Sequence, residues 1–338
     1  MNKDIVLNET ERYLNIHYNR PKALNALSDY LIFATQSSIS RTSKGIILTG
    51  EGRSFCSGGD ILEIVRRGHS PRFVFTFPAS LFYYIHTRQQ ETISLIDGLA
   101  IGGGAGYALS CSSKILTEKT SFSIPETHVG HTPDVGACYH LNKLCSEQLG
   151  IYMIVTGNSI TGADTYFAGF SDIFIPKITR EIKDHIMNNG VHGLEKFQVI
   201  PDSEKSSLLR KLPIINECFD RNYDVETMCR KLSSINNEWS RATLKTMLDS
   251  CPLSIKAGFE CFKKSQNLNY LQSMELEYNL SINLIENTKN FANGVRTKMI
   301  EKKNCRPQWE PLHLWECSES YVESFFYNQD SKLVHYKL

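Results

Sequence analysis

The segment SIPETHVGHTPDVG, Ser123 to Gly136, carries two carboxylates, Glu126 and Asp134, eight residues apart. Its prolines and glycines suit neither a helix interior nor a strand interior, so we expect an irregular loop. Such a loop can bring two acids to one reacting atom. Because neighbouring carboxyl groups push their pKa values apart, one can serve as base or nucleophile while the other carries a proton. The segment therefore predicts acid–base or nucleophilic chemistry.

Three other reactive side chains lie in or near the motifs, and we interpret them as structural. His128 and His131 flank the acids, but no third metal ligand is evident, so we predict no metal site. Cys56 stands in a glycine-rich segment, where packing as a small apolar side chain is the simpler interpretation. A metal or base role for the histidines and a nucleophilic role for Cys56 are the alternatives.

Two glycine clusters could supply the charge stabilisation that such chemistry needs. GEGRSFCSGGD, residues 50–60, follows the apolar run KGIIL, and DGLAIGGGAGYALS, residues 97–110, follows TISLI. Each pattern predicts a strand that enters a glycine-rich turn and then a helix. Backbone N–H groups at helix N-termini bind anions, so two facing turns could form an oxyanion hole. A phosphate-binding P-loop is excluded because no Gly-Lys-Ser/Thr follows, and tight packing of strand on helix is the alternative.

The chain around these motifs alternates between strands and helices. Apolar and β-branched runs predict strands over residues 4–7, 13–18, 44–50, 91–98 and 114–117, with a further short strand after the last. The intervening helical segments favour an α/β fold with a buried, largely parallel sheet. We predict two parts, a core with the active site over residues 1–200 and a mostly helical region over residues 201–338.

The second half of the chain has three features of its own. The polar, poorly periodic segment from Lys177 to Lys211 is interpreted as a variable linking region. Trp309 and Trp315 are expected to anchor an extended tail. One helical face is predicted from the apolar spacing of Leu268, Leu271, Met274, Tyr278, Ile282 and Ile285.

Composition excludes several classes of function. The 338 residues carry a formal net charge of +1, which gives no overall basic field for nucleic acid or anionic lipid. No apolar run approaches the roughly 20 residues of a membrane span, so we expect no membrane partner. Ten cysteines are scattered without a C-x-x-C pair, which is typical of reduced thiols in an intracellular protein. The N-terminus resembles neither a signal peptide nor a transit peptide and favours the cytoplasm.

Four motifs, in the same order and spacing, resemble the crotonase (enoyl-CoA hydratase/isomerase) superfamily: NRPKALNALS, GRSFCSGGDI, GLAIGGGAGYAL and SIPETHVGHTPDVG. The resemblance implies a crotonase (ClpP-like) spiral of ββα units, an acyl-CoA substrate and no metal or redox cofactor. It places the thioester carbonyl between the backbone N–H groups of Gly59 and Gly103. It also implies CoA- or substrate-binding positions at Leu24, Ser57, Asp60, Ile61, Gly102 and Gly104. A homo-oligomer is compatible with the superfamily.

The pattern of acids distinguishes among members of this superfamily. Hydratases use a second glutamate where this chain has Gly106, whereas Glu126 and Asp134 together resemble the 3-hydroxyisobutyryl-CoA hydrolase subfamily. The tail supports this with SCPLSIK, MELEYNLS, FANGVR and PQWEP. The resemblance implies hydrolysis of 3-hydroxyisobutyryl-CoA, or a close 3-hydroxyacyl-CoA, in valine breakdown. Glu126 would attack the thioester or activate a water, while Asp134 would orient the nucleophile and protonate the leaving thiolate.

Some features depart from the subfamily and keep alternatives open. FVFTFPASLFYYIHT contains no acid where these hydrolases carry one for the substrate hydroxyl; Phe77 and Pro78 occupy the approximate positions. The basic run VRRGHSPR, residues 65–72, is interpreted as a solvated face, with contact to CoA phosphates as the alternative. A non-catalytic crotonase-fold binding protein and an acyl-CoA isomerase are the rival functions. Family role implies the mitochondrial matrix, in contrast to the N-terminus.

Overall fold

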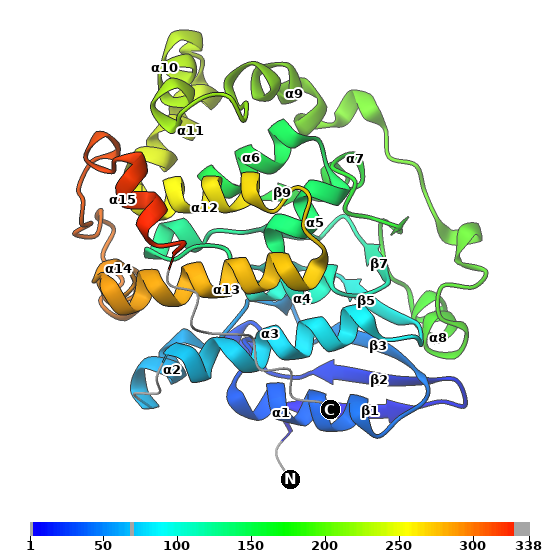
Figure 1. Ribbon diagram of the computed structural model, residues 1–338. Coiled ribbons are helices and arrows are strands. Elements are labelled where there is room, and N and C mark those ends of the chain that lie inside the picture. Colours follow the sequence, from blue (N-terminus) through cyan, green and yellow to red (C-terminus); the bar gives the residue numbers. More distant parts are fainter. Residues whose placement is uncertain (1–2, 68–70, 328–338) are drawn as a thin grey trace.

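The structure, a computed structural model, describes residues 3–67 and 71–327 (Figure 1). Its larger sheet has the strand order β1-β2-β3-β5-β7-β10, in which only β1 and β2 pair antiparallel. The strands are β1 (Ile5–Glu9), β2 (Tyr13–Tyr18), β3 (Gly45–Gly50), β5 (Thr92–Ile96), β7 (Ser113–Leu116) and β10 (Ile173–Phe174). The predicted buried, largely parallel sheet is therefore confirmed, and β2 has the predicted bounds.

A smaller sheet has the order β4-β6-β8-β9, parallel except for the last pair. Its strands are β4 (Ser54–Cys56), β6 (Leu99–Ile101), β8 (Ser121–Ser123) and β9 (Ile160–Thr161). In chain order, β3-β4, β5-β6 and β7-β8 each place their first strand in the larger sheet and their second in the smaller one. Each pair then leads towards a helix, which confirms the spiral of ββα units.

Helices follow each strand pair and position the motifs. After β4 come α2 (Ile61–Arg67) and α3 (Pro71–Thr87), after β6 comes α4 (Gly103–Leu109), and after β8 come η2 (Glu126–Val129) and α5 (Ala137–Leu144). The first glycine cluster thus lies between β4 and α2, and the second between β6 and α4. Both acids lie between β8 and α5, in the irregular loop that the sequence predicts.

The other helices complete the core and cover it. Helix α1 (Asp29–Ser40) lies between β2 and β3, α6 (Glu147–Thr156) and α7 (Asp164–Phe167) lie between β8 and β10, and α8 (Arg180–Asn189) follows β10. The second half of the described chain has no strand after Phe174 and contains α9 (Ser207–Cys218), α10 (Val225–Ile235), α11 (Glu238–Asp249), α12 (Pro252–Lys264), α13 (Tyr270–Asn287), α14 (Asn290–Val295) and α15 (Glu319–Ser324). None of the helices formed by the described residues is long and apolar enough to cross a bilayer.

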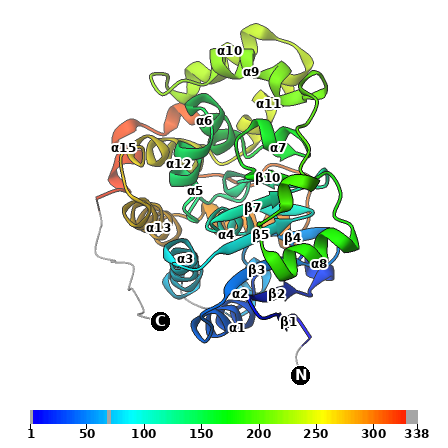
Figure 2. The same cartoon turned by 90° about the vertical axis from the view of Figure 1, so that its right-hand side faces the viewer.

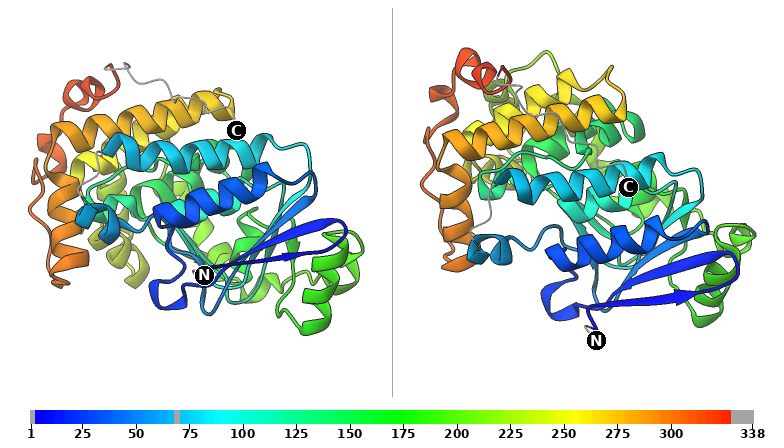
Figure 3. Two further views of the ribbon diagram at one scale, coloured as in Figure 1. Left: turned by 90° about the horizontal axis from the view of Figure 1, so that it is seen from below. Right: turned by 60° about the horizontal axis from the view of Figure 1, so that its bottom comes forward.

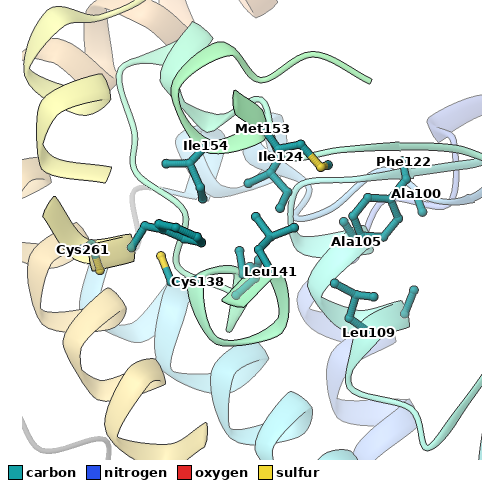
Figure 4. Packing of buried hydrophobic residues seen from close by; sticks show 14 of the residues in the cluster. Ala100, Ala105, Leu109, Phe122, Ile124, Cys138, Leu141, Met153, Ile154 and Cys261 are labelled. Carbon is teal, nitrogen blue, oxygen red and sulfur yellow. The ribbon is translucent and has the colours of Figure 1, made fainter. Parts of the chain in front are cut away.

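The C-terminal helices pack directly on the spiral. One apolar cluster joins Leu14 of β2 to Phe326 near the end of the described chain. In Figure 2, α9, α10 and α11 stack beyond α6 on the side opposite α1, and both views of Figure 3 show α13 alongside α3. Figure 4 shows Cys138 of α5 and Cys261 of α12 within one packed group. The division near residue 200 remains a prediction, and the two parts share this core.

Two predictions about the second half are corrected by the structure. The segment 177–211 is not simply a linker, because α8 begins at its Thr179 cap and buries Ile182 and Ile186. Trp309 is the expected anchor, buried and donating its ring N–H to the Asp249 carbonyl at 3.0 Å. Trp315 is instead 71% exposed and stacks on His313, because it lies on the outer side of the tail.

Candidate active site

A cavity of about 350 Å³ brings both glycine turns and both loop acids together. Of the predicted site residues, its lining includes Ser57, Gly59, Ile61, Gly102, Gly103, Glu126 and Asp134. The rest of the lining is largely apolar, with Leu27, Ile32, Phe75, Pro78, Ala79, Phe82, Val129, Val135 and Met299. Polar groups thus converge on a mostly apolar pocket, as in many sites for small molecules.

The two glycine turns contact each other across the cavity wall. A Cβ on Gly103 would lie 3.5 Å from the Gly59 nitrogen, an ordinary van der Waals distance, so the two turns are in direct contact. Gly103 is the first residue of α4, where N–H groups have no acceptor within the helix. Leu27 N donates to Gly58 O and Asp60 N to Leu27 O, which turns the Gly59 N–H away from Leu27. The pair can therefore present two donors to one oxygen.

Glu126 is a buried carboxyl group against the second glycine turn. Glu126 is the first residue of η2 and is only 7% exposed. Its Oε1 lies close to Gly102, at 2.8 Å from the position that a Cβ on that glycine would take. Among the residues that the structure describes, its Oε2 has no hydrogen-bond partner. Burial, and after it the neighbouring Asp134 carboxylate, raise the pKa of Glu126 to about 8. Glu126 can therefore exchange a proton near neutral pH.

Asp134 lies beside His131 in the same cavity. Their side chains are 8% and 5% exposed, and His131 Nε2 lies 3.3 Å from Asp134 Oδ2. The imidazole packs between Phe75 and Phe291, with ring centroids 5.0 and 5.2 Å away. His128 differs, because its Nε2 lies 2.8 Å from the Thr156 carbonyl oxygen and is engaged outside the acid pair. The two histidines thus have different surroundings, which the sequence interpretation did not separate.

Glu277 is a buried acid that sequence reasoning missed. It lies on α13, fully buried, and its carboxylate accepts the backbone N–H groups of Gly136, Ala137 and Cys138 at 2.9 to 3.1 Å. Burial and the Asp134 carboxylate raise the pKa of Glu277 to about 8, against the lowering effect of these donors. The contact joins a C-terminal helix to the end of the acid loop. The sequence feature that could have identified Glu277 is the position of an acid within the predicted apolar face of residues 268–285.

Three predicted binding positions do not line the cavity and support it instead. Asp60 accepts the Glu63 N–H at 3.1 Å at the start of α2 and pairs with Arg20 at 2.9 Å. Leu24 has a left-handed backbone, φ 52°, and its carbonyl accepts the Ser57 N–H at 3.1 Å. Gly104 packs on Cys56, whose carbonyl oxygen would lie 2.0 Å from an added Cβ. Any contact of these residues with CoA remains a prediction.

The packing around Gly106 explains why no second acid stands at position 106. A Cβ there would lie 2.4 Å from both the Cβ and the carbonyl oxygen of Val135, which follows Asp134. Because the neighbour includes backbone, a side chain at position 106 would displace the acid loop. The loop in this chain therefore occupies the space that a second glutamate would need.

The wall formed by α3 is apolar. Phe75, Pro78, Ala79 and Phe82 line the cavity, whereas Phe77 packs on Phe33 at 4.8 Å between ring centroids. Pro78 therefore faces the cavity, whereas Phe77 is not part of its lining. In the basic run, residues 68–70 lie outside the described residues, and Arg72 pairs with Glu286 through two contacts of 2.9 Å.

Cys56 behaves as a packing residue. It is fully buried, and burial raises the pKa of its thiol to about 12, so the nucleophilic thiolate is scarce near neutral pH. No group of three or more metal-ligating side chains is found among the described residues.

Comparisons with known proteins agree with this architecture. The model of the enoyl-CoA hydratase/isomerase family matches residues 13–326. The chain is 30% identical to 3-hydroxyisobutyryl-CoA hydrolase 1 of Arabidopsis thaliana, covering 91% of this chain and 87% of that protein. It is 25% identical to small ribosomal subunit protein mS47 of the same plant, covering 91% and 80%. A carnitinyl-CoA dehydratase structure from Mycobacterium thermoresistibile superimposes with a TM-score of 0.90 at 25% identity, covering all of both chains. The chain therefore belongs to the enoyl-CoA hydratase/isomerase family.

Proposed function

We propose that this protein hydrolyses the thioester bond of an acyl-CoA, with 3-hydroxyisobutyryl-CoA or a close 3-hydroxyacyl-CoA as the substrate. The observation that carries the proposal is the cavity in which Glu126 and Asp134 meet the turns of Gly59 and Gly103. The similarity to a plant 3-hydroxyisobutyryl-CoA hydrolase supports the choice of substrate.

The glycine turns would stabilise the charge that develops on the carbonyl oxygen. When an oxygen nucleophile adds to a thioester, negative charge gathers on that oxygen. The backbone N–H groups of Gly59 and Gly103 would donate to it, and one such donor is worth about 3 to 4 kcal/mol of barrier. Because both donors belong to the backbone, no side-chain rearrangement is required during the reaction.

Glu126 would act in its ionised form, as base for a water or as nucleophile. As a base, it removes the proton of a water whose oxygen bonds to the carbonyl carbon, and the C–S bond then breaks with its electron pair on sulfur. As a nucleophile, it forms a mixed anhydride that water hydrolyses. Since its pKa is raised to about 8, the ionised fraction in the free protein grows as pH rises towards 8. We expect kcat/KM to rise over the same range.

The structure disfavours hydration of an enoyl-CoA. Hydration uses two acid/base groups, and Val135 occupies the space of a side chain at position 106. A non-catalytic role is the second candidate, because a ribosomal protein is 25% identical to this chain over most of its length. The convergence of both acids and both turns on one cavity favours the enzyme.

The cavity wall formed by α3 bears on which acyl group the protein accepts. The α3 wall offers Phe75, Pro78 and Ala79, and the sequence of α3 contains no acid to bind a hydroxyl. An apolar wall discriminates weakly against a substrate that merely lacks a hydroxyl group. We therefore expect unhydroxylated, branched acyl groups to be hydrolysed as well.

Release of the CoA thiol, followed with a thiol reagent, tests the proposal. The substrates are (S)-3-hydroxyisobutyryl-CoA, 3-hydroxypropionyl-CoA and isobutyryl-CoA, with hydration of crotonyl-CoA measured in parallel. We expect thiol release from the hydroxyacyl substrates, release from isobutyryl-CoA within about tenfold, and no hydration. A folded, CoA-binding protein that releases no thiol from any of them would reject hydrolysis and favour the non-catalytic role.

A further inference from the structure

His131 is held rigidly in the wall of the cavity. Its backbone N–H donates to the Glu126 carbonyl at 3.1 Å, and the next residue, Thr132, bonds through its hydroxyl to Ser281 of α13 at 2.9 Å. Phe75 of α3 and Phe291 of α14 flank the imidazole. The ring position is therefore fixed by three separate elements of the fold.

The polar atoms of this ring are not used by the fold. Both ring nitrogens are buried, and neither makes a well-aligned hydrogen bond with any group in residues 3–67 and 71–327. Asp134 Oδ2 lies 3.3 Å from Nε2, which is within hydrogen-bond distance but not in hydrogen-bond alignment. Contacts of this kind often tighten when substrate binds. A buried, unsatisfied imidazole is costly, which makes a purely structural role a poor explanation.

The ring lies beside an acidic side chain, in a cavity lining whose described residues include no other free basic group. Three carboxyl groups, those of Glu126, Asp134 and Glu277, interact electrostatically here. The cavity lining that the structure describes contains no lysine or arginine. His128 is the other histidine of the lining, and its Nε2 is engaged by the Thr156 carbonyl. His131 is thus the cavity group that can hold a positive charge beside Asp134.

We propose that His131 and Asp134 act as one unit, in which the imidazole holds the proton that Asp134 passes to the departing thiolate. The proposal rests on the hydrolysis proposed above and extends it. Aspartic acids ordinarily have pKa values near 3.9 and imidazoles near 6.5, so a histidine is the better store of protons near neutral pH. His131 acts through Asp134 and is in this sense a positioning residue.

Each proton that moves in this step has a donor and an acceptor. Water gives one proton to Glu126 and its oxygen to the carbonyl carbon, and the C–S bond breaks with its electron pair on sulfur. The His131 N–H gives its proton to Asp134, and Asp134 passes that proton to sulfur. The proton on Glu126 then returns to the imidazole, directly or through water. The products are the acid and the CoA thiol, and no other reactant is consumed.

Replacement of the leaving group separates this role from simple packing. The variant His131→Phe keeps a ring between Phe75 and Phe291 but cannot hold a proton; His131→Asn is a second, polar variant. Each is assayed on an acyl-CoA and on the same acyl group attached to thionitrobenzoate, whose thiolate leaves without a proton. Loss of general-acid assistance costs about 100-fold or more. We expect that loss in kcat on the acyl-CoA and a change of about threefold or less on the aryl thioester.

A double-mutant cycle tests the same unit on acyl-CoA alone. If the two side chains act together, His131→Phe added to Asp134→Asn slows the reaction little beyond Asp134→Asn alone. His128→Phe is the matched control, and its effect should multiply with that of Asp134→Asn. Three results would overturn the proposal while leaving hydrolysis intact. These are an equal loss of kcat on both thioesters for His131→Phe, no loss of kcat for that variant, and effects of His131→Phe and Asp134→Asn on the rate that multiply. A wild-type protein that releases no thiol would overturn both.

Discussion

Replacement of Glu126 by glutamine should stabilise the protein while removing its proposed activity. A buried carboxyl with a raised pKa stays protonated in the folded protein, while the unfolded chain loses that proton near the ordinary value of 4.5. The folded state is therefore favoured fully below pH 4.5, loses stability as pH rises to about 8, and changes little beyond that. Glutamine has nearly the shape of the protonated acid and cannot ionise, so it removes this loss.

The size of the effect follows from the pKa values. A rise from 4.5 to about 8 is worth up to about 5 kcal/mol at about 1.4 kcal/mol per unit. Between pH 5 and pH 8, the gain in unfolding free energy from Glu126→Gln should grow by about 3 kcal/mol.

Urea unfolding of both proteins at pH 5 and pH 8 measures this gain, because the midpoint and slope give the free energy at each pH. Glu217→Gln is the control, since Glu217 is exposed at the end of α9 and should give the same small change at both pH values. A Glu126→Gln effect that does not grow with pH would refute the assignment of Glu126 as a buried, proton-holding acid.

Three further predictions concern the groups around the acids. Gly106→Ala should cost about 1 to 3 kcal/mol of unfolding free energy, because the alanine Cβ would collide with Val135. For the same reason, Gly106→Glu should not create crotonyl-CoA hydration. A stable Gly106→Glu variant that hydrates crotonyl-CoA would contradict this prediction. Glu277→Gln should lower kcat, since the glutamine amide keeps only one of the two oxygens that accept three backbone N–H groups at the end of the acid loop, while Glu275→Gln should leave kcat unchanged. Pro78→Glu should raise the kcat/KM ratio of 3-hydroxyisobutyryl-CoA to isobutyryl-CoA about tenfold, because a carboxylate in the α3 wall can accept a hydrogen bond from the substrate hydroxyl. An unchanged ratio would place the acyl group elsewhere in the cavity.

The fold was predictable because its strands carry strong local signals. Ile46, Ile47 and Leu48 form a fully buried β-branched and apolar run, and β2 began and ended where the sequence indicated. The glycine clusters and the loop acids were also identified, since their residue types suit few other structures. By contrast, α8 was missed because only Ile182 and Ile186 mark its buried face within a polar segment.

The parts of the site that escaped prediction depend on contacts between distant segments. Glu277 reaches the acid loop from 141 residues away, which no local pattern encodes. The difference between His128 and His131 arises from Thr156 on one side and Phe291 on the other. The assignment of Asp60 to CoA remains a prediction, and its contacts with the start of α2 and with Arg20, 40 residues earlier, were not foreseen. The residue types therefore indicated the candidate site residues, whereas the contacts of each candidate depend on tertiary packing.

The most direct measurement is the rate of CoA-thiol release from (S)-3-hydroxyisobutyryl-CoA by wild-type protein and by Glu126→Gln, with CoA binding measured for both. We expect turnover by the wild type, a loss of about 100-fold or more in kcat for the variant, and unchanged binding. Equal thiol release by the two proteins would contradict a hydrolytic role for Glu126.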